Sequence, residues 1–284
     1  MKKILVPTDF SDHAANAAYY AKALARQFNA HITLFHVYTL PPAVVYPPLY
    51  SAGHANQPVM HDEVIKLEQE NDLRLRGFRE KLLNGKDDPC CNIVQRSGFV
   101  CDSIIDFAEE KKFDMIVMGT RGSGSASDFF IATNTWEVIS SGKATVLAIP
   151  EKLPYTPLKH FAFASDFSDT DFDSISTITS IAEKFKAKVS VVHVKTSDDS
   201  LSEEQMMNWF EEKVHSVNPY PNIEFHILKH DKVQEALNEF IKENQVNVLA
   251  MVNRKYNIFK RLFHKNLTRK FAYHSDVPLM VFSQ

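Results

Sequence analysis

An internal repeat constrains the fold of this chain more than any other sequence feature. Residues 6–12 read Val-Pro-Thr-Asp-Phe-Ser-Asp, and residues 163–169 read Phe-Ala-Ser-Asp-Phe-Ser-Asp. The match runs without a gap to His36-Val37 and His193-Val194, and nine of these 32 positions are identical. A sequence that repeats itself over this length contains one structural unit twice.

The terminal parts of the two copies also align, at a smaller offset. Val100, Phe107, Met118, Arg121 and Thr135 fall on Val233, Phe240, Met251, Arg254 and Thr268. The second copy is shorter, mainly where the first has a proline-rich segment. With 284 residues, the chain is long for one core. We therefore expect two domains, residues 1–150 and 158–284, joined by a proline-containing linker that begins at Glu151.

Each copy alternates apolar strands with amphipathic helices. In the first copy the pattern predicts strands at residues 4–6, 32–37, 92–96, 115–118 and 145–149. It predicts a helix capped by Ser11 and Asp12, and further helices at residues 63–84, 102–111 and 133–141. Right-handed crossovers then favour a parallel sheet. The predicted fold class is α/β, with two tandem open parallel five-stranded sheets and helices on both faces.

Residues 38–62 interrupt this pattern with five prolines and three tyrosines. We expect a loop here, because the segment shows little periodicity. Loops of this length are uncommon and are often functional. Two interpretations stay open for this segment: a lid over a ligand, and an insertion that is disordered or packs at an interface.

The stretch from Met115 to Thr135 joins an apolar strand to a glycine-rich loop and then to a helix. Gly119, Gly122 and Gly124 allow the backbone to turn sharply with its N–H groups exposed. Thr133 and Asn134 follow where the helix begins. Free N–H groups at a helix start favour a bound anion, so this stretch predicts a phosphate-binding loop. Its spacing is neither that of the Walker loop nor that of the dinucleotide-binding motif.

The spacing instead resembles the G-x2-G-x9-G-(S/T) nucleotide loop of the universal stress protein family. Gly119 and Gly122 match the first two glycines, and Ala132 stands where the third would be. The strand, Asp-Phe-Ser and alanine-rich helix at the chain's start also resemble this family, over nearly the whole chain. The resemblance implies an adenine nucleotide alpha hydrolase-like fold and ATP as ligand, alone or with Mg2+.

Parallel strands place their ligands at their carboxyl ends. Asp9 is expected to accept hydrogen bonds from adenine or ribose, and the resemblance implies that it lies in the adenosine pocket. A helix N-cap is an equal alternative for Asp9. Val37 and Met118 either line the base or belong to the core, and Arg121 either meets a phosphate or is solvated. The predicted nucleotide-binding residues are Pro7, Thr8, Asp9, Ser11, Val37, Met118, Gly119, Arg121, Gly122, Gly124, Ala132, Thr133 and Asn134.

No hydrolase motif accompanies these residues, so we assign no catalytic residue and no metal ligand. His36 and His193 recur at the second strand of each copy and are interpreted as structural. The function favoured is an ATP-binding, nucleotide-dependent regulator of a stress response. Two alternatives stay open: a protein-interaction module that binds no nucleotide, and a slow ATPase in which Asp128 and Arg121 would act.

The second copy lacks the glycine loop. Gly119, Gly122, Ala132 and Thr133 become Val252, Lys255, Lys265 and Asn266, so side chains occupy the space that a phosphate needs. Seven Lys or Arg and no acid lie between residues 254 and 270. A solvated basic face is favoured over a patch that binds an acidic partner or nucleic acid, because the rest of the chain is acidic. We therefore expect one nucleotide per chain.

The composition restricts partners and location. The formal net charge of −3 gives no overall basic field toward nucleic acid, and no apolar run approaches a membrane span. Three cysteines without metal-ligand spacing predict buried or incidental thiols. We expect a cytoplasmic protein, an intramolecular pseudo-dimer through strands 145–149 and 278–282, and homodimers as a further assembly.

Overall fold

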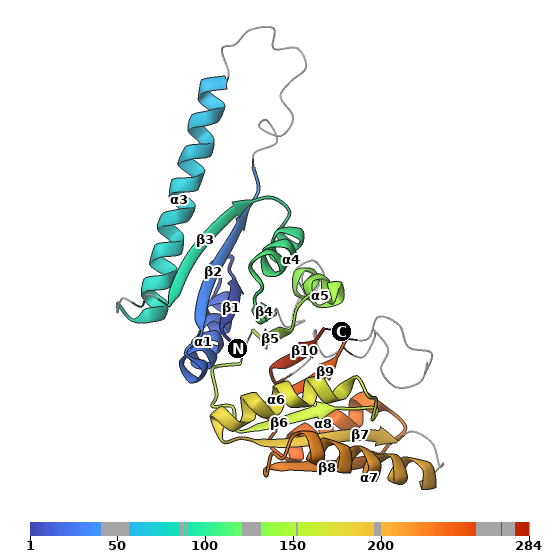
Figure 1. Cartoon of the computed structure of the whole chain (residues 1–284). Coiled ribbons are helices and arrows are strands. Elements are labelled where there is room, and N and C mark those ends of the chain that lie inside the picture. Colours follow the sequence, from blue (N-terminus) through green and yellow to red (C-terminus); the bar gives the residue numbers. More distant parts are fainter. Residues whose placement is uncertain are drawn as a thin grey trace, which may run out of the picture. The chain divides into compact units, whose positions relative to one another are not determined.

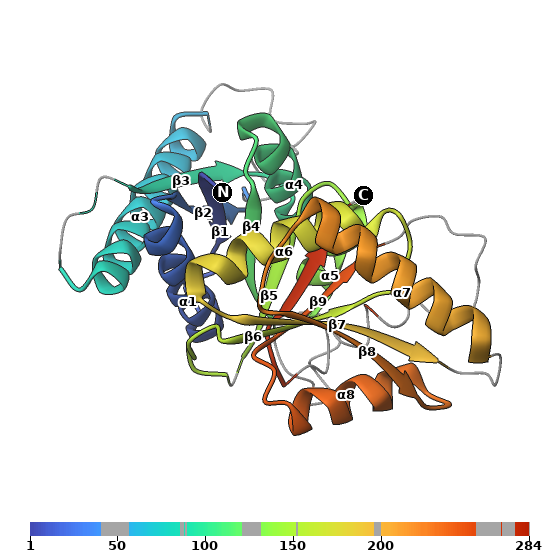
Figure 2. The same cartoon turned by 60° about the horizontal axis from the view of Figure 1, so that its bottom comes forward.

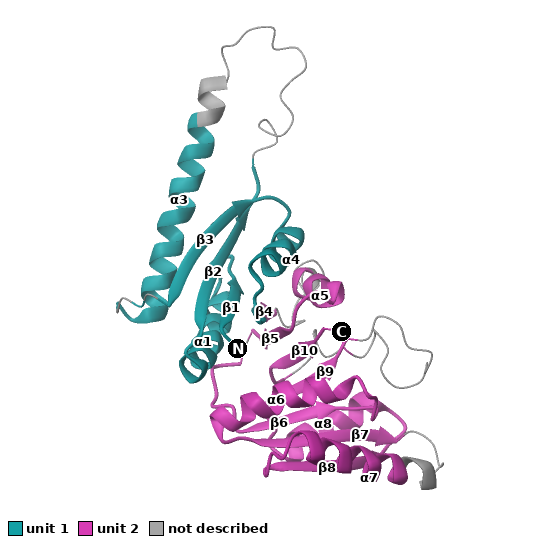
Figure 3. Ribbon diagram, in the orientation of Figure 1, with its two compact units in different colours: residues 1–118 teal, residues 119–284 magenta. Residues whose placement is uncertain are grey.

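The computed structural model describes residues 1–40, 57–85, 88, 90–120, 132–151, 153–195, 200–253, 268 and 276–283. Strands and helices alternate along the chain, so the predicted α/β fold class is confirmed (Figure 1). The chain forms two compact units, residues 1–118 and residues 119–284 (Figure 3). Each unit is described by itself below.

Unit 1 is a parallel sheet with helices on both faces. Its strands lie in the order β3-β2-β1-β4, and every pair is parallel. The middle of β1 is apolar without alternation, because helices cover both faces of the sheet. Helices α1 and α3 contact each other on one face, and α4 contacts β2 from the other (Figure 1). The elements are β1 (Lys3–Pro7), α1 (Asp12–Phe28), β2 (His31–Tyr38), α3 (Gln57–Leu83), β3 (Cys91–Ser97), α4 (Val100–Lys111) and β4 (Met115–Thr120).

Unit 2 contains the end of β4 and all later elements. Its strands lie in the order β5-β10-β9-β6-β7-β8. Figure 2 shows α8 on the opposite face of β6, β7 and β8 from α6 and α7. The elements are α5 (Ala132–Ser141), β5 (Val146–Pro150), β6 (His160–Ala164), α6 (Asp171–Phe185), β7 (Lys188–Lys195), α7 (Ser200–Val217), β8 (Ile223–Lys229), α8 (Val233–Glu243), β9 (Val248–Val252) and β10 (Leu279–Phe282).

Strands β5 and β10 form the one antiparallel pair in this order. Leu279 lies opposite Ala148, Met280 opposite Leu147 and Val281 opposite Val146. These are the fifth strands of the two sequence copies, so the predicted contact between them is confirmed. Because β5 pairs with β10, spatial contact assigns β5 to unit 2, whereas the sequence repeat assigns it to the first copy.

Helix α3 begins earlier than the sequence predicted. Residues 57–62 are helical, although we expected the loop to continue to residue 62. Pro58 lies in the first helical turn, where a missing N–H group costs no hydrogen bond. Residues 41–56, the rest of the expected loop, lie outside the described residues.

Buried leucines, a hydrogen bond and a ring contact hold α3 against the rest of unit 1. Leu75 and Leu82 are buried. The Tyr38 hydroxyl donates a hydrogen bond of 2.7 Å to Glu68. Phe78 lies edge-on to Phe10, with ring centroids 6.2 Å apart. These contacts fix which face of α3 points to the sheet and which face points to solvent.

Two of the three cysteines are buried, as the sequence predicted. Cys91 and Cys101 lie in the core and Cys90 is half-buried, and all three are free thiols. Burial raises the pKa of the Cys91 thiol to about 11, so this group stays protonated at neutral pH. None of the helices in the described part of the chain is both long enough and apolar enough to span a membrane.

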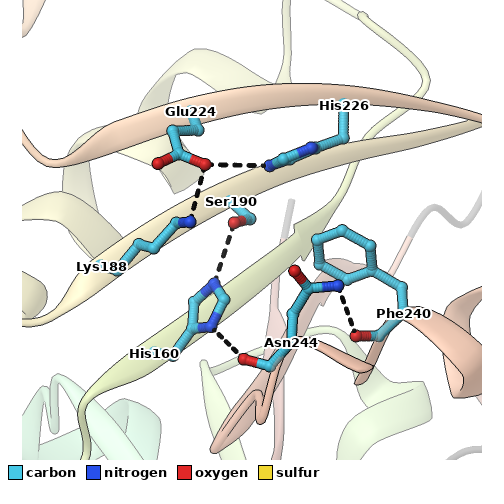
Figure 4. A network of polar contacts seen from close by, with 7 residues as sticks. All are labelled: His160, Lys188, Ser190, Glu224, His226, Phe240 and Asn244. Carbon is cyan, nitrogen blue, oxygen red and sulfur yellow. Dashed lines mark hydrogen bonds and ion pairs between the residues drawn. The ribbon is translucent and has the colours of Figure 1, made fainter. Parts of the chain in front are cut away.

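A polar network holds the amino ends of β6, β7 and β8 together (Figure 4). His160 Nδ1 lies 2.9 Å from the Asn244 carbonyl, and a carbonyl only accepts, so Nδ1 carries the proton. His160 Nε2 then accepts from Ser190 Oγ at 2.9 Å. On the same edge, Glu224 lies 2.7 Å from Lys188 Nζ and 3.4 Å from His226 Nε2.

This network predicts a loss of stability on mild acidification. Burial, opposed by the Asn244 carbonyl and reinforced by Lys188, lowers the pKa of His160 below 6.5. Burial, opposed by Glu224, likewise lowers the pKa of His226. The folded state therefore binds fewer protons than the unfolded state, so stability is fully present above pH 6.5 and falls as the pH drops below it.

Thermal unfolding between about pH 7.5 and pH 5 tests this expectation, because the carboxylates with lowered pKa values titrate below this window. The midpoint should decrease toward pH 5. In the double variant His160→Asn, His226→Asn the unfolding midpoint should decrease less toward pH 5. Some decrease should remain, because the pKa of His36 in the first copy is also lowered. An unchanged slope in the double variant would contradict the assignment.

Candidate functional site

The turn after β1 carries the first four predicted site residues. The Thr8 N–H group donates to the Phe35 carbonyl at 2.8 Å, which continues the pairing of β1 with β2. Thr8 Oγ1 accepts from the Phe10 N–H group at 3.0 Å. Phe10 has φ of 67°, a left-handed conformation that non-glycine residues rarely adopt. The backbone therefore turns sharply at Asp9 and Phe10 before α1 begins.

His36 holds this turn in place. Its Nδ1 lies 2.8 Å from the Thr8 carbonyl and therefore donates, and its ring lies 4.4 Å from the Phe10 ring. Burial lowers the pKa of His36, the Thr8 carbonyl opposes this shift and nearby Arg74 adds to it. The histidine is thus a neutral packing residue, in agreement with the structural role that the sequence assigned to it.

The second copy repeats the two hydrogen bonds and the left-handed residue that shape this turn. Ser165 Oγ accepts from the Phe167 N–H group at 2.9 Å, and Phe167 has φ of 58°. His193 Nδ1 lies 2.9 Å from the Ser165 carbonyl, and its ring stacks on Phe167 at 4.6 Å. The turn is therefore a property of the repeated fold and does not by itself identify a ligand site.

Asp9 and Ser11 share the helix-capping role that the sequence left open for Asp9. Ser11 is the N-cap of α1, and its hydroxyl accepts from the Ala14 N–H group at 3.3 Å. Asp9 Oδ1 accepts from the Ser11 N–H group at 3.0 Å and also from the Ser11 hydroxyl. Asp9 thus orients the cap from outside the helix.

The Asp9 carboxylate is ionised at neutral pH. Partial burial raises its pKa, but the hydrogen bonds from the Ser11 side chain and backbone, with His13, lower the pKa overall. The side chain is exposed. Among the described residues, Oδ2 has no hydrogen-bond partner, so this oxygen can accept a hydrogen bond from a ligand.

The apolar members of the predicted site lie at strand ends. Ile4 and Leu5 of β1 pair with Met115 and Ile116 of β4 in parallel register. Both strands therefore end at the same edge of the sheet, where Pro7 and Val37 are half-buried and Met118 is 6% exposed. Met118 thus belongs to the core, whereas Pro7 and Val37 offer some surface to a ligand.

The two ends of the glycine-rich segment are joined by a hydrogen bond. Thr135, in the first turn of α5, donates through Oγ1 to the Gly119 carbonyl at 3.0 Å. Ala132 and Thr133 begin α5, and Asn134 follows as an exposed residue. Arg121, Gly122 and Gly124 lie outside the described residues, as does Asp128. Thr135 is not among the predicted site residues, although the sequence repeat aligns it with Thr268.

The other end of α5 is held by the second copy. Asn253, at the end of β9, donates through Nδ2 to the Ile139 carbonyl of α5 at 2.8 Å. Its own N–H group donates to the Phe282 carbonyl at 2.9 Å. Asn253 is 4% exposed, so this is a buried contact between elements of the two copies. Its position corresponds to Thr120 in the first copy, and nothing in the sequence predicted the contact.

A groove of about 360 Å³ lies elsewhere in unit 1, between α1 and α3. Ala15, Tyr19, Phe78 and Leu82 contribute to its lining. None of the predicted nucleotide-binding residues borders this groove, so it does not coincide with the site at the strand ends.

Comparison with known proteins matches both copies to one family. The sequence model of the Universal stress protein family matches residues 1–150 and again residues 157–283. A universal stress protein from Thermus aquaticus is 29% identical over 148 residues, covering 52% of this chain and 98% of its own. One from Methanocaldococcus jannaschii is 28% identical over 148 residues, covering 52% of this chain and 81% of its own.

A solved structure extends the likeness to the whole chain. The crystal structure of a universal stress protein from Archaeoglobus fulgidus covers 99% of this chain and 96% of its own, with a TM-score of 0.66. Its sequence identity of 15% limits this likeness to the fold. The two matches to the family model together span nearly all of the sequence, so both copies are assigned to the family. The chain belongs to the universal stress protein family.

Proposed function

We propose that the first copy binds an adenine nucleotide, ATP, and that the protein acts as a nucleotide-dependent regulator in a stress response. The observation that carries the proposal is the hydrogen bond from Thr135 to the Gly119 carbonyl. It fixes a strand end against the first turn of a helix, with the glycine-rich segment between them. Backbone N–H groups at such a position bind phosphate oxygens.

Asp9 contributes a second recognition element in this proposal. Its carboxylate is ionised and exposed, and Oδ1 is occupied by Ser11. Oδ2 can accept hydrogen bonds from the ribose hydroxyls, which a carboxylate binds more strongly than a neutral acceptor does. The family resemblance of Asp9 supports the same assignment. Mg2+ would accompany the phosphates and needs no dedicated protein ligand set.

A protein-interaction module is the second candidate, and the β5–β10 pair favours it. The two copies share this antiparallel pair, and the second copy lacks the glycines of the loop. In this alternative the paired copies present a surface to another protein, and ATP binding has no part in the function.

Titration calorimetry with ATP separates these candidates. We expect a stoichiometry near one nucleotide per chain, because only the first copy combines the glycine loop with room for the anion. Lys255→Ala should leave both affinity and stoichiometry unchanged. Mass spectrometry of the purified protein should detect a bound adenine nucleotide. Absence of binding in both measurements would favour the interaction module, and a ratio of two would place a site in the second copy as well.

A further inference from the structure

The outer face of α3 carries an exposed leucine that the packing of unit 1 does not use. Leu73 is 69% exposed, whereas Leu75 and Leu82 on the opposite side of the helix are buried. Figure 1 shows β3 and β2 lying along one side of α3. The helix is therefore amphipathic toward its own sheet and has a separate apolar residue that faces outward.

The residues around Leu73 have a regular pattern of charge. Positions three, four and seven residues away on a helix share one face with the central residue. On the amino-terminal side these positions are Glu70, Gln69 and Lys66. On the carboxyl-terminal side they are Arg76, Gly77 and Glu80. Six of these seven side chains are exposed, and Gly77 is half-buried.

The pattern is self-complementary about Leu73. Glu70 and Arg76 lie three residues from Leu73 on either side and have opposite charges. Lys66 and Glu80 lie seven residues away on either side and again have opposite charges. Suppose that two copies of α3 pack antiparallel with Leu73 on the twofold axis. A residue that lies n positions before Leu73 then meets the residue that lies n positions after Leu73 in the partner subunit.

This arrangement brings Glu70 opposite Arg76 of the partner subunit, and Lys66 opposite Glu80 of the partner subunit. The twofold axis makes each pair occur twice, which gives four intermolecular ion pairs around a Leu–Leu contact. Parallel packing would instead place each charge against its own copy, which is repulsive. The charges therefore select the antiparallel orientation.

The side chains of this face are free to make such contacts. In the part of the chain that the structure describes, Lys66, Glu70 and Glu80 form no ion pair. Arg76 uses Nε to bind Asp72 at 2.6 Å, which leaves its other N–H groups available. A Cβ atom added at Gly77 would meet nothing within 4 Å, so the surface is open beside Leu73 and a second helix can approach closely.

We propose that the outer face of α3 is a homodimer interface in which two chains pack antiparallel through Leu73. The face from residue 66 to residue 80 is about 21 Å long, given the rise of an α-helix. An interface of this length is small and half polar, which is typical of weak, reversible association. The dimer is therefore concentration-dependent, it weakens with salt, and it involves neither β5 nor the nucleotide site.

Sedimentation of the full chain from about 1 µM to about 500 µM measures this association. Lys66→Glu should weaken the dimer at least about tenfold, because the new acid meets the partner's Glu80 on both sides of the axis. Glu80→Lys should weaken it similarly. The double variant Lys66→Glu, Glu80→Lys should restore the original affinity. A double variant as weak as either single variant would overturn the proposal, as would a monomeric parent protein.

Two further variants control for the fold. Glu243→Lys reverses an exposed charge on α8, away from this face, and should leave the dimer unchanged. Leu73→Glu should abolish the dimer while circular dichroism and thermal unfolding of the monomer stay unchanged, because Leu73 has no packing role in its own chain. Loss of the dimer in Glu243→Lys would mean that net charge, and not this face, controls association.

Cross-linking with a short bismaleimide tests the register in a Cys90→Ser background. Leu73→Cys should link to itself, because this position lies on the axis. Lys66→Cys alone should not, but a mixture of Lys66→Cys and Glu80→Cys chains should form mixed dimers. Efficient self-linkage of Lys66→Cys would indicate parallel packing and would contradict the proposal.

Discussion

Met280→Asp is expected to prevent the chain from folding stably. Met280 lies in the middle of β10, opposite Leu147 of β5 and Ala250 of β9, and all three residues are 0% exposed. An aspartate there would be a buried charge without a partner. The expected loss of stability is more than about 4 kcal/mol, which corresponds to a decrease in the unfolding temperature of about 10 °C or a loss of soluble protein.

Met206→Asp provides the matched control for this change. Met206 lies on α7 and is 44% exposed, so an aspartate there stays in water. Its effect on stability should be within about 0.5 kcal/mol. A folded Met280→Asp protein with an unchanged unfolding temperature would show that β10 does not lie between β5 and β9.

Gly122→Val is expected to remove ATP binding without unfolding the protein. In the proposed site the backbone of the glycine loop approaches the phosphates closely, and a branched side chain obstructs that approach. We expect the affinity measured by calorimetry to fall at least about 100-fold. The unfolding temperature without nucleotide should change by less than about 2 °C, because the substitution adds no buried charge and removes no core side chain.

A graded pair of variants shows whether the loop acts through its backbone. Gly122→Ala should weaken binding less than Gly122→Val. Ala132→Gly should tighten it, since this change completes the three-glycine spacing of the family. If stability and affinity fell together in Gly122→Val, the loop would be a structural element and the proposed phosphate site would be wrong.

The sequence predicted the strands well because their physical signal is local. Ile4 to Val6 are apolar without interruption, and Ile32, Leu34, Phe35 and Val37 make most of the next strand apolar, as is typical of buried parallel strands. The strands β1 and β2 each extend the predicted range by one residue at either end. The predicted start of α3 was wrong, because a proline-rich segment is typical of a loop but does not exclude a helix that begins within it. A helix accepts proline in its first turn, so Pro58 does not mark the boundary.

Features that depend on long-range contacts could not be predicted in the same way. Phe10 takes a left-handed φ that usually indicates glycine or asparagine. Thr8, two residues before it, and His36, on the neighbouring strand, stabilise this conformation. The Thr135 and Asn253 hydrogen bonds join residues 16 and 114 positions apart. Composition and periodicity carry no information on such pairs.

The β5–β10 pair has a consequence for how the two copies can differ. Separate chains that met through equivalent strands would dissociate on dilution, and any chain could meet any other. In one polypeptide the local concentration of each strand at its partner is set by the tether and not by protein abundance. The pairing is therefore insensitive to dilution, and every molecule contains one copy of each kind. Each molecule therefore contains one copy with Gly122 and one copy with Lys255 at the equivalent position. Within a chain, pairs of two first copies or of two second copies cannot form in place of this mixed pair.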